Sequence, residues 1–130
     1  VISRMADLAA KKGILVVNSA GNDGSGSWRY IGAPADGDSV LSVGAVNNSG
    51  IIASFSSYGP TSDGQIKPDV VSVGAGTVLS NTSGNTTSGN GTSFSCPNMA
   101  GLAACLWQLF PEFNNWKIIT TLRHSADRFN

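Results

Sequence analysis

Hydrophobic residues recur at helical spacing in the first ten positions of the chain. Four of them follow the i, i+3, i+4, i+7 pattern that places side chains on one face of a helix: Ile2, Met5, Ala6 and Ala9. Gly13 is a typical stop after such a helix, and the aliphatic run at residues 14–18 predicts a fully buried strand of the parallel kind. A helix that leads directly into a buried strand is half of an α/β crossover unit.

Short apolar stretches alternate with turns through the middle of the chain. Residues 40–46 predict a second strand, and residues 51–57 predict a third that is less regular. Two more short strands are expected at residues 70–73 and 77–80. Residues 81–90 consist of Ser, Thr, Gly and Asn, which fits either a low-complexity stretch or the tip of a hairpin.

Two helices are predicted near the end of the chain. The first covers residues 93–110 and is ended by Pro111; its apolar stripe comprises Met99, Ala103, Leu106 and Phe110. The second covers residues 116–126 and is capped by Asn114 or Asn115; its inward positions are Ile119, Leu122 and Ala126. No internal repeat or second domain is visible, so we expect one α/β unit with a mainly parallel sheet.

The composition argues against two classes of function. Charged residues make up 12% of the chain, about half of the roughly 25% that is usual in soluble domains, and the eight basic residues are scattered. Without a basic run, the chain has no electrostatic basis for binding nucleic acid. The longest aliphatic run, residues 14–17, is far too short to span a membrane. The low fraction of charged residues fits either a compact secreted-type protein or a piece of a larger fold. The chain starts at Val1 rather than Met, which suggests a processed or truncated product.

The two cysteines and the single histidine do not predict a metal site. Cys96 and Cys105 lie nine positions apart on one predicted helix, which places them on opposite faces, so no disulfide is expected between them. We interpret both as small buried thiols. Together with His124 they cannot supply the four ligands of a usual Cys and His zinc site.

Ser93 stands at the predicted start of a long helix, in the segment Gly-Thr-Ser-Phe-Ser-Cys-Pro-Asn-Met-Ala-Gly of residues 91–101. The backbone N–H groups of a first helical turn are unpaired, and the helix dipole adds positive potential there. Such a field stabilises an oxyanion, which is what a carbonyl group becomes when a hydroxyl attacks it. Gly91 allows a substrate backbone to come close. Ser93 is therefore a candidate nucleophile for acyl transfer.

Two other interpretations use the same position. Ser93 can be a simple N-cap, which is the commonest role of a serine before an apolar helix. A glycine-rich loop at a helix start can also bind phosphate, but the lysine of the G-x-x-x-x-G-K-[ST] pattern is absent. Other serine hydrolase patterns fail, because Ser95 replaces the second glycine of G-x-S-x-G and no lysine completes S-x-x-K. A lone helical histidine such as His124 is more often a surface or capping residue than a catalyst.

Residues 91–101 closely resemble the serine motif of the subtilisin-like family (subtilases), Gly-Thr-Ser-Met-Ala-x-Pro-x-Val-Ala-Gly, in which Ser93 takes the place of the nucleophile. Residues 13–24 resemble the family's buried strand that ends in Ala-Gly-Asn, which implies that Asn22 donates its side-chain amide to the oxyanion. The resemblance also implies substrate-binding roles for Gly21, Gly91 and Thr92. Further family-like stretches extend it over essentially the whole chain, at residues 30–46, 55–60, 67–70 and 116–127.

Two stretches depart from the family pattern. Residues 71–76 replace the usual Val-x-Ala-Pro-Gly, and Phe94 and Ser95 stand where the family has Met-Ala. The two changes after the nucleophile keep similar side-chain sizes and should be tolerated. The resemblance implies a three-layer αβα fold that is subtilisin-like but incomplete. It also implies a cis peptide bond between Ala33 and Pro34.

The resemblance implies a serine endopeptidase that hydrolyses peptide bonds through an acyl-enzyme on Ser93. The family's triad has the chain order Asp, His, Ser, so the first two members would lie upstream of this chain. Asp23, Asp69 and His124 are no substitutes for them. We therefore expect residues 1–130 to be the C-terminal part of a catalytic domain and to be inactive alone. The alternative is a pseudoprotease or protein-binding module that retains the fold.

The resemblance also sets the expected partners. It implies a peptide or protein substrate, whereas the scattered charges and the short aliphatic runs argue against nucleic acid and a membrane span. No cofactor is indicated, and a calcium ion is left open. The family implies a secreted or cell-envelope location. If the chain is only part of the domain, its sheet ends at a strand whose edge has no partner. We therefore expect the truncated chain to self-associate.

Overall fold

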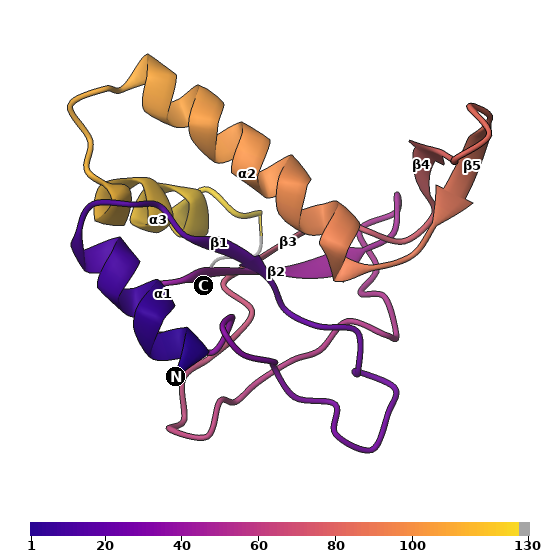
Figure 1. Cartoon of the computed structure of the whole chain (residues 1–130), viewed down its shortest axis with the longest axis horizontal. Coiled ribbons are helices and arrows are strands. Elements are labelled where there is room, and N and C mark those ends of the chain that lie inside the picture. Colours follow the sequence, from indigo (N-terminus) through magenta and orange to yellow (C-terminus); the bar gives the residue numbers. More distant parts are fainter. Residues whose placement is uncertain (128–130) are drawn as a thin grey trace.

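The computed structural model describes residues 1–127 and shows an α/β arrangement (Figure 1). Its helices are α1 (Ile2–Lys11), α2 (Thr92–Leu109) and α3 (Asn115–His124). Its strands are β1 (Val17–Ser19), β2 (Leu41–Val46), β3 (Val70–Val73), β4 (Thr77–Ser80) and β5 (Thr86–Gly89). Most predicted elements are present with shifted ends, and the Ala33–Pro34 peptide bond is cis, as predicted.

The strands β1, β2 and β3 form a parallel sheet in that order, which confirms the predicted mainly parallel arrangement. Val17 lies opposite Leu41, and Val43 lies opposite Val70. All six residues of β2 are buried, as expected for the central strand of a parallel sheet, whereas the three residues of β1 are only half-buried. The outer strands are thus the less covered parts of this sheet.

The main core lies between the sheet and the helices α2 and α3 (Figure 1). Its buried members are Leu41, Val43, Val70, Ala103, Ile118, Ile119 and Leu122. Figure 1 shows α1 and the long loops on the other side of the sheet, where a smaller cluster contains Ala20, Ile31 and Ala35. This layering is the expected αβα arrangement in partial form. Among the helices of residues 1–127, none has the length and apolar character needed to cross a membrane.

The burial of α1 and β1 differs from the prediction. Ile2 and Met5, which belong to the predicted inner face of α1, are 64% and 56% exposed, and Ala10 is the buried residue of that helix. The strand predicted at residues 14–18 is not fully buried, because Ile14 is 57% exposed and pairing begins only at Val17. The strand β1 is exposed because it is an outer strand, and no described element of the chain pairs with its free edge. The face of α1 that carries Ile2 and Met5 is likewise not covered by any element of residues 1–127.

Residues 51–57 do not form the third strand that their apolar pattern predicted. A single antiparallel bridge joins Ile52 to Val46. The Ala45 N–H donates to Oγ of Ser56 at 3.0 Å, so a side chain takes the place of a strand-to-strand bond and pairing stops. The local hydroxyl therefore outweighs the β-propensity of the apolar residues.

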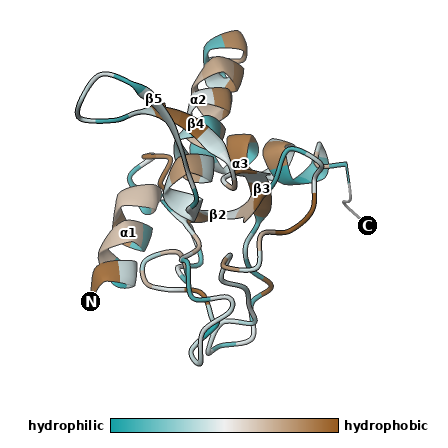
Figure 2. Cartoon of the chain, turned by 90° about the vertical axis from the view of Figure 1, so that its right-hand side faces the viewer, coloured by the Kyte–Doolittle hydropathy of each residue, from teal (hydrophilic) through white to brown (hydrophobic). Residues whose placement is uncertain are grey.

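The strands β4 and β5 form an antiparallel hairpin, which confirms the hairpin alternative for residues 81–90. Thr77 pairs with Gly89. At the tip, Oδ1 of Asn81 accepts hydrogen bonds from the N–H groups of Ser83 and Asn85, each at 3.0 Å. Figure 2 shows the hairpin projecting from the body beside α2, with a hydrophilic tip.

The helix α3 begins where a capping asparagine was predicted. Oδ1 of Asn114 accepts from the Lys117 N–H at 2.9 Å. The inward role predicted for Ala126 is wrong, because α3 has ended at His124 and Ala126 is exposed. Ile118, which the apolar pattern did not single out, is fully buried in its stead.

The two cysteines are unpaired, as their spacing on α2 predicted. Cys96 is half-buried, and burial raises the pKa of its thiol. Cys105 is exposed, so the buried-thiol interpretation is wrong for this residue. The cause is that the face of α2 opposite Cys96 points away from the core.

Candidate active site

The helix α2 begins at Thr92, with Gly91 as its N-cap. Its cap makes no side-chain hydrogen bond, so the interpretation of Ser93 as an N-cap is wrong. Ser93 is the second residue of the helix, and it is exposed. A backbone N–H at this position has no acceptor within its own helix, and it finds none elsewhere among residues 1–127. The turn thus presents a hydroxyl and a free N–H group together.

Asn22 comes from the loop after β1 and contacts the same turn. Its side chain bonds twice to Thr92, at 2.8 Å from the backbone N–H and at 2.9 Å from the hydroxyl. Because a backbone N–H can only donate, the Asn22 atom that faces it is Oδ1. The Nδ2 group then lies beside Gly91, since a Cβ added there would be 3.6 Å from it. The fold thus brings together two segments 70 positions apart and leaves the amide donor beside the Ser93 turn.

Gly21 supports the position of Asn22. Its N–H donates to Oγ1 of Thr92 at 3.2 Å, and its φ of +113° is a conformation that favours glycine. Ser57 fixes the loop from the other side, because its N–H donates to the Gly21 carbonyl at 2.9 Å and its Oγ accepts from the Asp23 N–H at 3.0 Å. Sequence analysis did not single out Ser57. Its only signal was the family-like stretch at residues 55–60.

Gly74 is a second residue that sequence analysis missed. Its carbonyl accepts from the Gly91 N–H at 2.8 Å. A Cβ on Gly74 would lie 2.7 Å from the Gly91 carbonyl oxygen and 3.1 Å from Cβ of Ser95. The end of β3 therefore packs directly under the turn that carries Ser93. Gly74 lies in the stretch that departs from the family pattern, so no motif pointed to it.

We expect Gly74→Ala to destabilise the protein by about 1–3 kcal/mol, because the added methyl group overpacks a backbone contact. Gly101→Ala is the matched control, since Gly101 is exposed on α2 and a Cβ there meets nothing within 4 Å. This control is expected to raise stability by about 0.5–1 kcal/mol through helix propensity. Urea denaturation of both variants measures the difference. Equal effects would contradict the tight packing of Gly74 under Gly91.

Three residues were rejected above as substitutes for the missing Asp and His of the triad, and the structure places each of them in another setting: Asp23, Asp69 and His124. The Asp69 carboxylate bonds to Lys67 and to Ser42 at the sheet. The Asp23 N–H bonds to Ser57. His124 is the last residue of α3. Within residues 1–127, no group of three or more His, Cys, Asp or Glu side chains is gathered that could hold a metal ion.

The sequence of the chain matches the Subtilase family over residues 2–130. It is 37% identical over 126 residues to Subtilisin DY of Bacillus licheniformis, covering 96% of this chain and 44% of that protein. Among solved structures, Sphericase is similar with a TM-score of 0.82 at 28% identity, over 96% of this chain and 44% of that one. The S41 psychrophilic protease is similar with a TM-score of 0.79 at 29% identity and the same coverage.

These matches cover nearly all of this chain but less than half of each relative, so the chain spans only part of the length of the proteins that it resembles. The sequence match includes both segments that meet at the Ser93 turn. The chain belongs to the subtilase family of serine proteases.

Proposed function

We propose that the full-length protein is a serine endopeptidase in which Ser93 is the nucleophile. One observation supports this most directly. Both hydrogen bonds from Thr92 hold Oδ1 of Asn22, so the Nδ2 donor is left beside the turn that presents the Ser93 hydroxyl and N–H. Two donors that converge near a hydroxyl are what stabilises a tetrahedral oxyanion. The base and its orienting carboxylate would come from polypeptide outside this chain.

The proposed reaction assigns each group one role. Oγ of Ser93 attacks the carbonyl carbon of a peptide bond while a histidine base takes the hydroxyl proton. The carbonyl π electrons move onto oxygen, where the Ser93 N–H and Nδ2 of Asn22 stabilise the charge. The C–N bond then breaks, the amine leaves with the proton, and water hydrolyses the acyl-enzyme. Gly21, Gly91 and Thr92 would bind the substrate backbone and keep Asn22 in place.

A fluorophosphonate probe tests this proposal against the pseudoprotease alternative. It phosphonylates a serine only where a base activates the hydroxyl. We expect labelling of the full-length protein at Ser93, mapped by mass spectrometry, and none of residues 1–130 alone. An unlabelled full-length protein would favour a pseudoprotease or protein-binding module. Strong labelling of the short chain would show that it is not inactive by itself.

We expect Asn22→Asp to lower kcat by at least about 10²–10³-fold, the loss known for removal of this donor in a subtilisin. The aspartate keeps an oxygen for the two Thr92 donors but cannot donate to the oxyanion. The matched control is Thr92→Ser, which keeps the hydroxyl that contacts Asn22 and Gly21. Kinetics on a chromogenic peptide measure both. A fall in kcat that is equal in the two variants would argue against a donor role of Asn22.

We propose a peptide or protein substrate and a secreted or cell-envelope location, both supported by the family alone. We also propose that residues 1–130 self-associate when expressed alone, since β1 has a free edge and the neighbouring groove of Ile14, Leu15, Ala104 and Trp107 is apolar. Sedimentation equilibrium tests this, and a monomer at high concentration would contradict it.

A further inference from the structure

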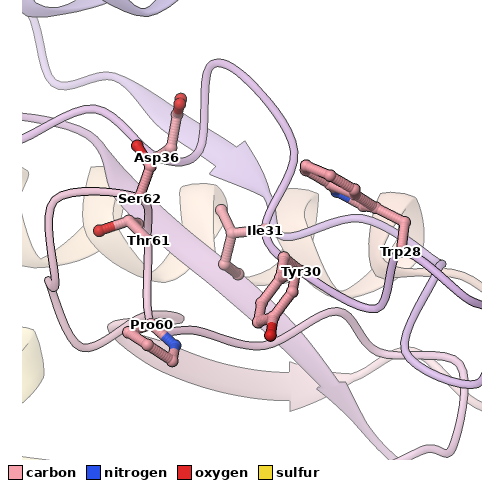
Figure 3. Close-up of a pocket in the computed structure, with 7 residues that line it drawn as sticks. All are labelled: Trp28, Tyr30, Ile31, Asp36, Pro60, Thr61 and Ser62. Atoms are coloured by element: carbon pink, nitrogen blue, oxygen red, sulfur yellow. The ribbon is translucent and has the colours of Figure 1, made fainter.

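A cavity of about 450 Å³ lies among the loops on the far side of the sheet from α2 and α3 (Figure 3). Its lining includes Trp28, Tyr30, Ile31, Asp36, Pro60 and Ser62. This volume is in the range of sites that take a small ligand or a side chain. None of these residues takes part in the site at Ser93.

Aromatic rings form one wall of the cavity. Trp28 is 63% exposed and meets Tyr30 edge-on, with ring centroids 5.8 Å apart and an interplanar angle of 84°. Arg29 already lies over the Tyr30 ring, with its Cζ 5.5 Å from the centroid. No cation lies over the Trp28 ring among the described residues, so its π face is still available. Arg29 has a φ of 52°, an uncommon value for a residue other than glycine, and it turns the chain between the two rings.

Carboxylates gather near the other wall. Asp36 accepts one hydrogen bond, from the Ser3 hydroxyl to Oδ1 at 2.5 Å, and no donor among residues 1–127 reaches its second oxygen. Asp38 and Asp63 lie close to each other, since Nε2 of Gln65 donates to both, at 2.6 and 2.8 Å. Hydrogen bonds from Thr61 and Gln65 lower the pKa of Asp63, so it stays charged. Of these carboxylates, only Asp36 lines the cavity. Asp38 follows it by two residues, and Asp63 follows the lining residue Ser62, so this side of the cavity, the acidic rim, is negative. The Ser62 hydroxyl makes no hydrogen bond within residues 1–127 and adds a further polar group.

We propose that this cavity binds an arginine side chain from a basic segment of a second protein. A guanidinium group stacks on the Trp28 ring and donates to the open oxygen of Asp36, and the arginine stem packs on Ile31 and Pro60. Arginine suits this combination because its planar cation both stacks on aromatic rings and donates several hydrogen bonds. The positive charge of Arg29 on the Tyr30 side directs the ligand's cation toward Trp28 and the acidic rim.

The cavity is connected to the loop that carries Asn22. The N–H of Gly32, next to the cavity residue Ile31, donates to the Ala20 carbonyl at 3.1 Å, two residues before Asn22. A basic segment held here is thus anchored on the same loop that contributes to the Ser93 turn. The inference does not rest on catalysis, because it needs only the cavity, the open Trp28 face and the acidic rim.

Fluorescence anisotropy with the full-length Ser93→Ala protein tests the proposal without cleavage of the probe. The probe is a fluorescein-labelled hexapeptide of alternating alanine and arginine, and its control has neutral citrulline at each arginine position. We expect saturable binding of the arginine peptide and at least about tenfold weaker binding of the citrulline peptide. Trp28→Ala and Asp36→Asn should each weaken binding about five- to tenfold, as expected for the loss of a cation–π contact or a charged hydrogen bond.

Glu112→Gln is the matched control for net charge, because Glu112 is exposed in the loop between α2 and α3. It is expected to leave binding unchanged. Three outcomes would overturn the proposal: no saturable binding of the arginine peptide, equal binding of the citrulline peptide, or equal weakening by Glu112→Gln and Asp36→Asn. None of these results depends on whether the wild-type protein cleaves peptides, so the two proposals fail independently.

Discussion

Replacing Ser93 by alanine is expected to lower kcat of the full-length protein by about 10⁶-fold, the size known for the same change in a subtilisin. The loss is this large because, in the proposed mechanism, the hydroxyl forms the covalent bond of the acyl-enzyme, and the N–H of the turn cannot replace it. KM should change little, since the Ser93 side chain makes no hydrogen bond within residues 1–127 and is exposed. Steady-state kinetics on a chromogenic peptide, at concentrations of folded protein set by absorbance, measure both constants.

Ser95→Ala is the matched control for this experiment. Ser95 lies two residues further along α2, is fully buried, and donates from Oγ to the Thr92 carbonyl at 2.9 Å. Its loss should cost about 1–2 kcal/mol of stability and leave most of the activity. Unchanged hydrolysis in Ser93→Ala would remove the nucleophile from the proposal. A total loss in both variants would mean that the turn, and not its hydroxyl, is what the activity depends on.

The sequence predicted β2 and α2 most reliably, for two different reasons. The strand β2 is mostly apolar and is buried at every position, so its pattern matches its surroundings within this chain. The helix α2 is only partly buried, but Gly91 precedes it and Pro111 follows it, and these residues indicate where it begins and ends. The strand β1 looked equally apolar, yet it is an outer strand with an exposed Ile14. Periodicity reports what a segment can bury, whereas the burial itself depends on what packs against it.

At the candidate site, the sequence predicted the residues proposed to act in the reaction and missed residues that hold them in place. Ser93 was predicted from a hydroxyl at a helix start and from the family's serine motif, whereas Asn22 was predicted only from resemblance to the family's Ala-Gly-Asn motif. Gly74 and Ser57 were missed, because the close approach of one backbone to another leaves no periodic signal in the sequence. The N-cap interpretation of Ser93 failed for a related reason. The helix starts one residue earlier than predicted, and Gly91 takes the cap position.

A buried ion pair beside β2 supports the sheet from which the Asn22 loop leads and against which the Ser93 turn packs through Gly74. Nζ of Lys67 lies 2.8 Å from Oδ2 of Asp69, and their side chains are only 3% and 4% exposed. Lys67 also donates to the Val40 carbonyl at 2.8 Å. Asp69 in turn accepts from the N–H and the hydroxyl of Ser42 on β2, at 2.8 and 2.9 Å. The carboxylate thus connects the start of β3 to β2, with Lys67 as its buried counter-ion.

Asp69→Asn is expected to destabilise the full-length protein by about 3–5 kcal/mol, because it leaves the Lys67 cation buried without a counter-charge. Lys67→Met should cost less. In that variant the Asp69 carboxylate keeps both donors of Ser42 and the more distant Arg123, whose Nε is 3.8 Å from Oδ1. Urea denaturation at constant pH measures the free energy of unfolding of each variant.

The double variant with Lys67→Met and Asp69→Asn tests whether the loss of stability in Asp69→Asn comes from the broken Lys67–Asp69 ion pair. With Lys67 already replaced by methionine, no buried cation remains to be left unpaired, so Asp69→Asn should then cost about 2 kcal/mol less than it does alone. A coupling of this size assigns the loss to the unpaired charge. Strict additivity of the two changes would instead assign it to the bonds between Asp69 and Ser42. The carboxylate would then be important as a link between β2 and β3 and not as a counter-ion.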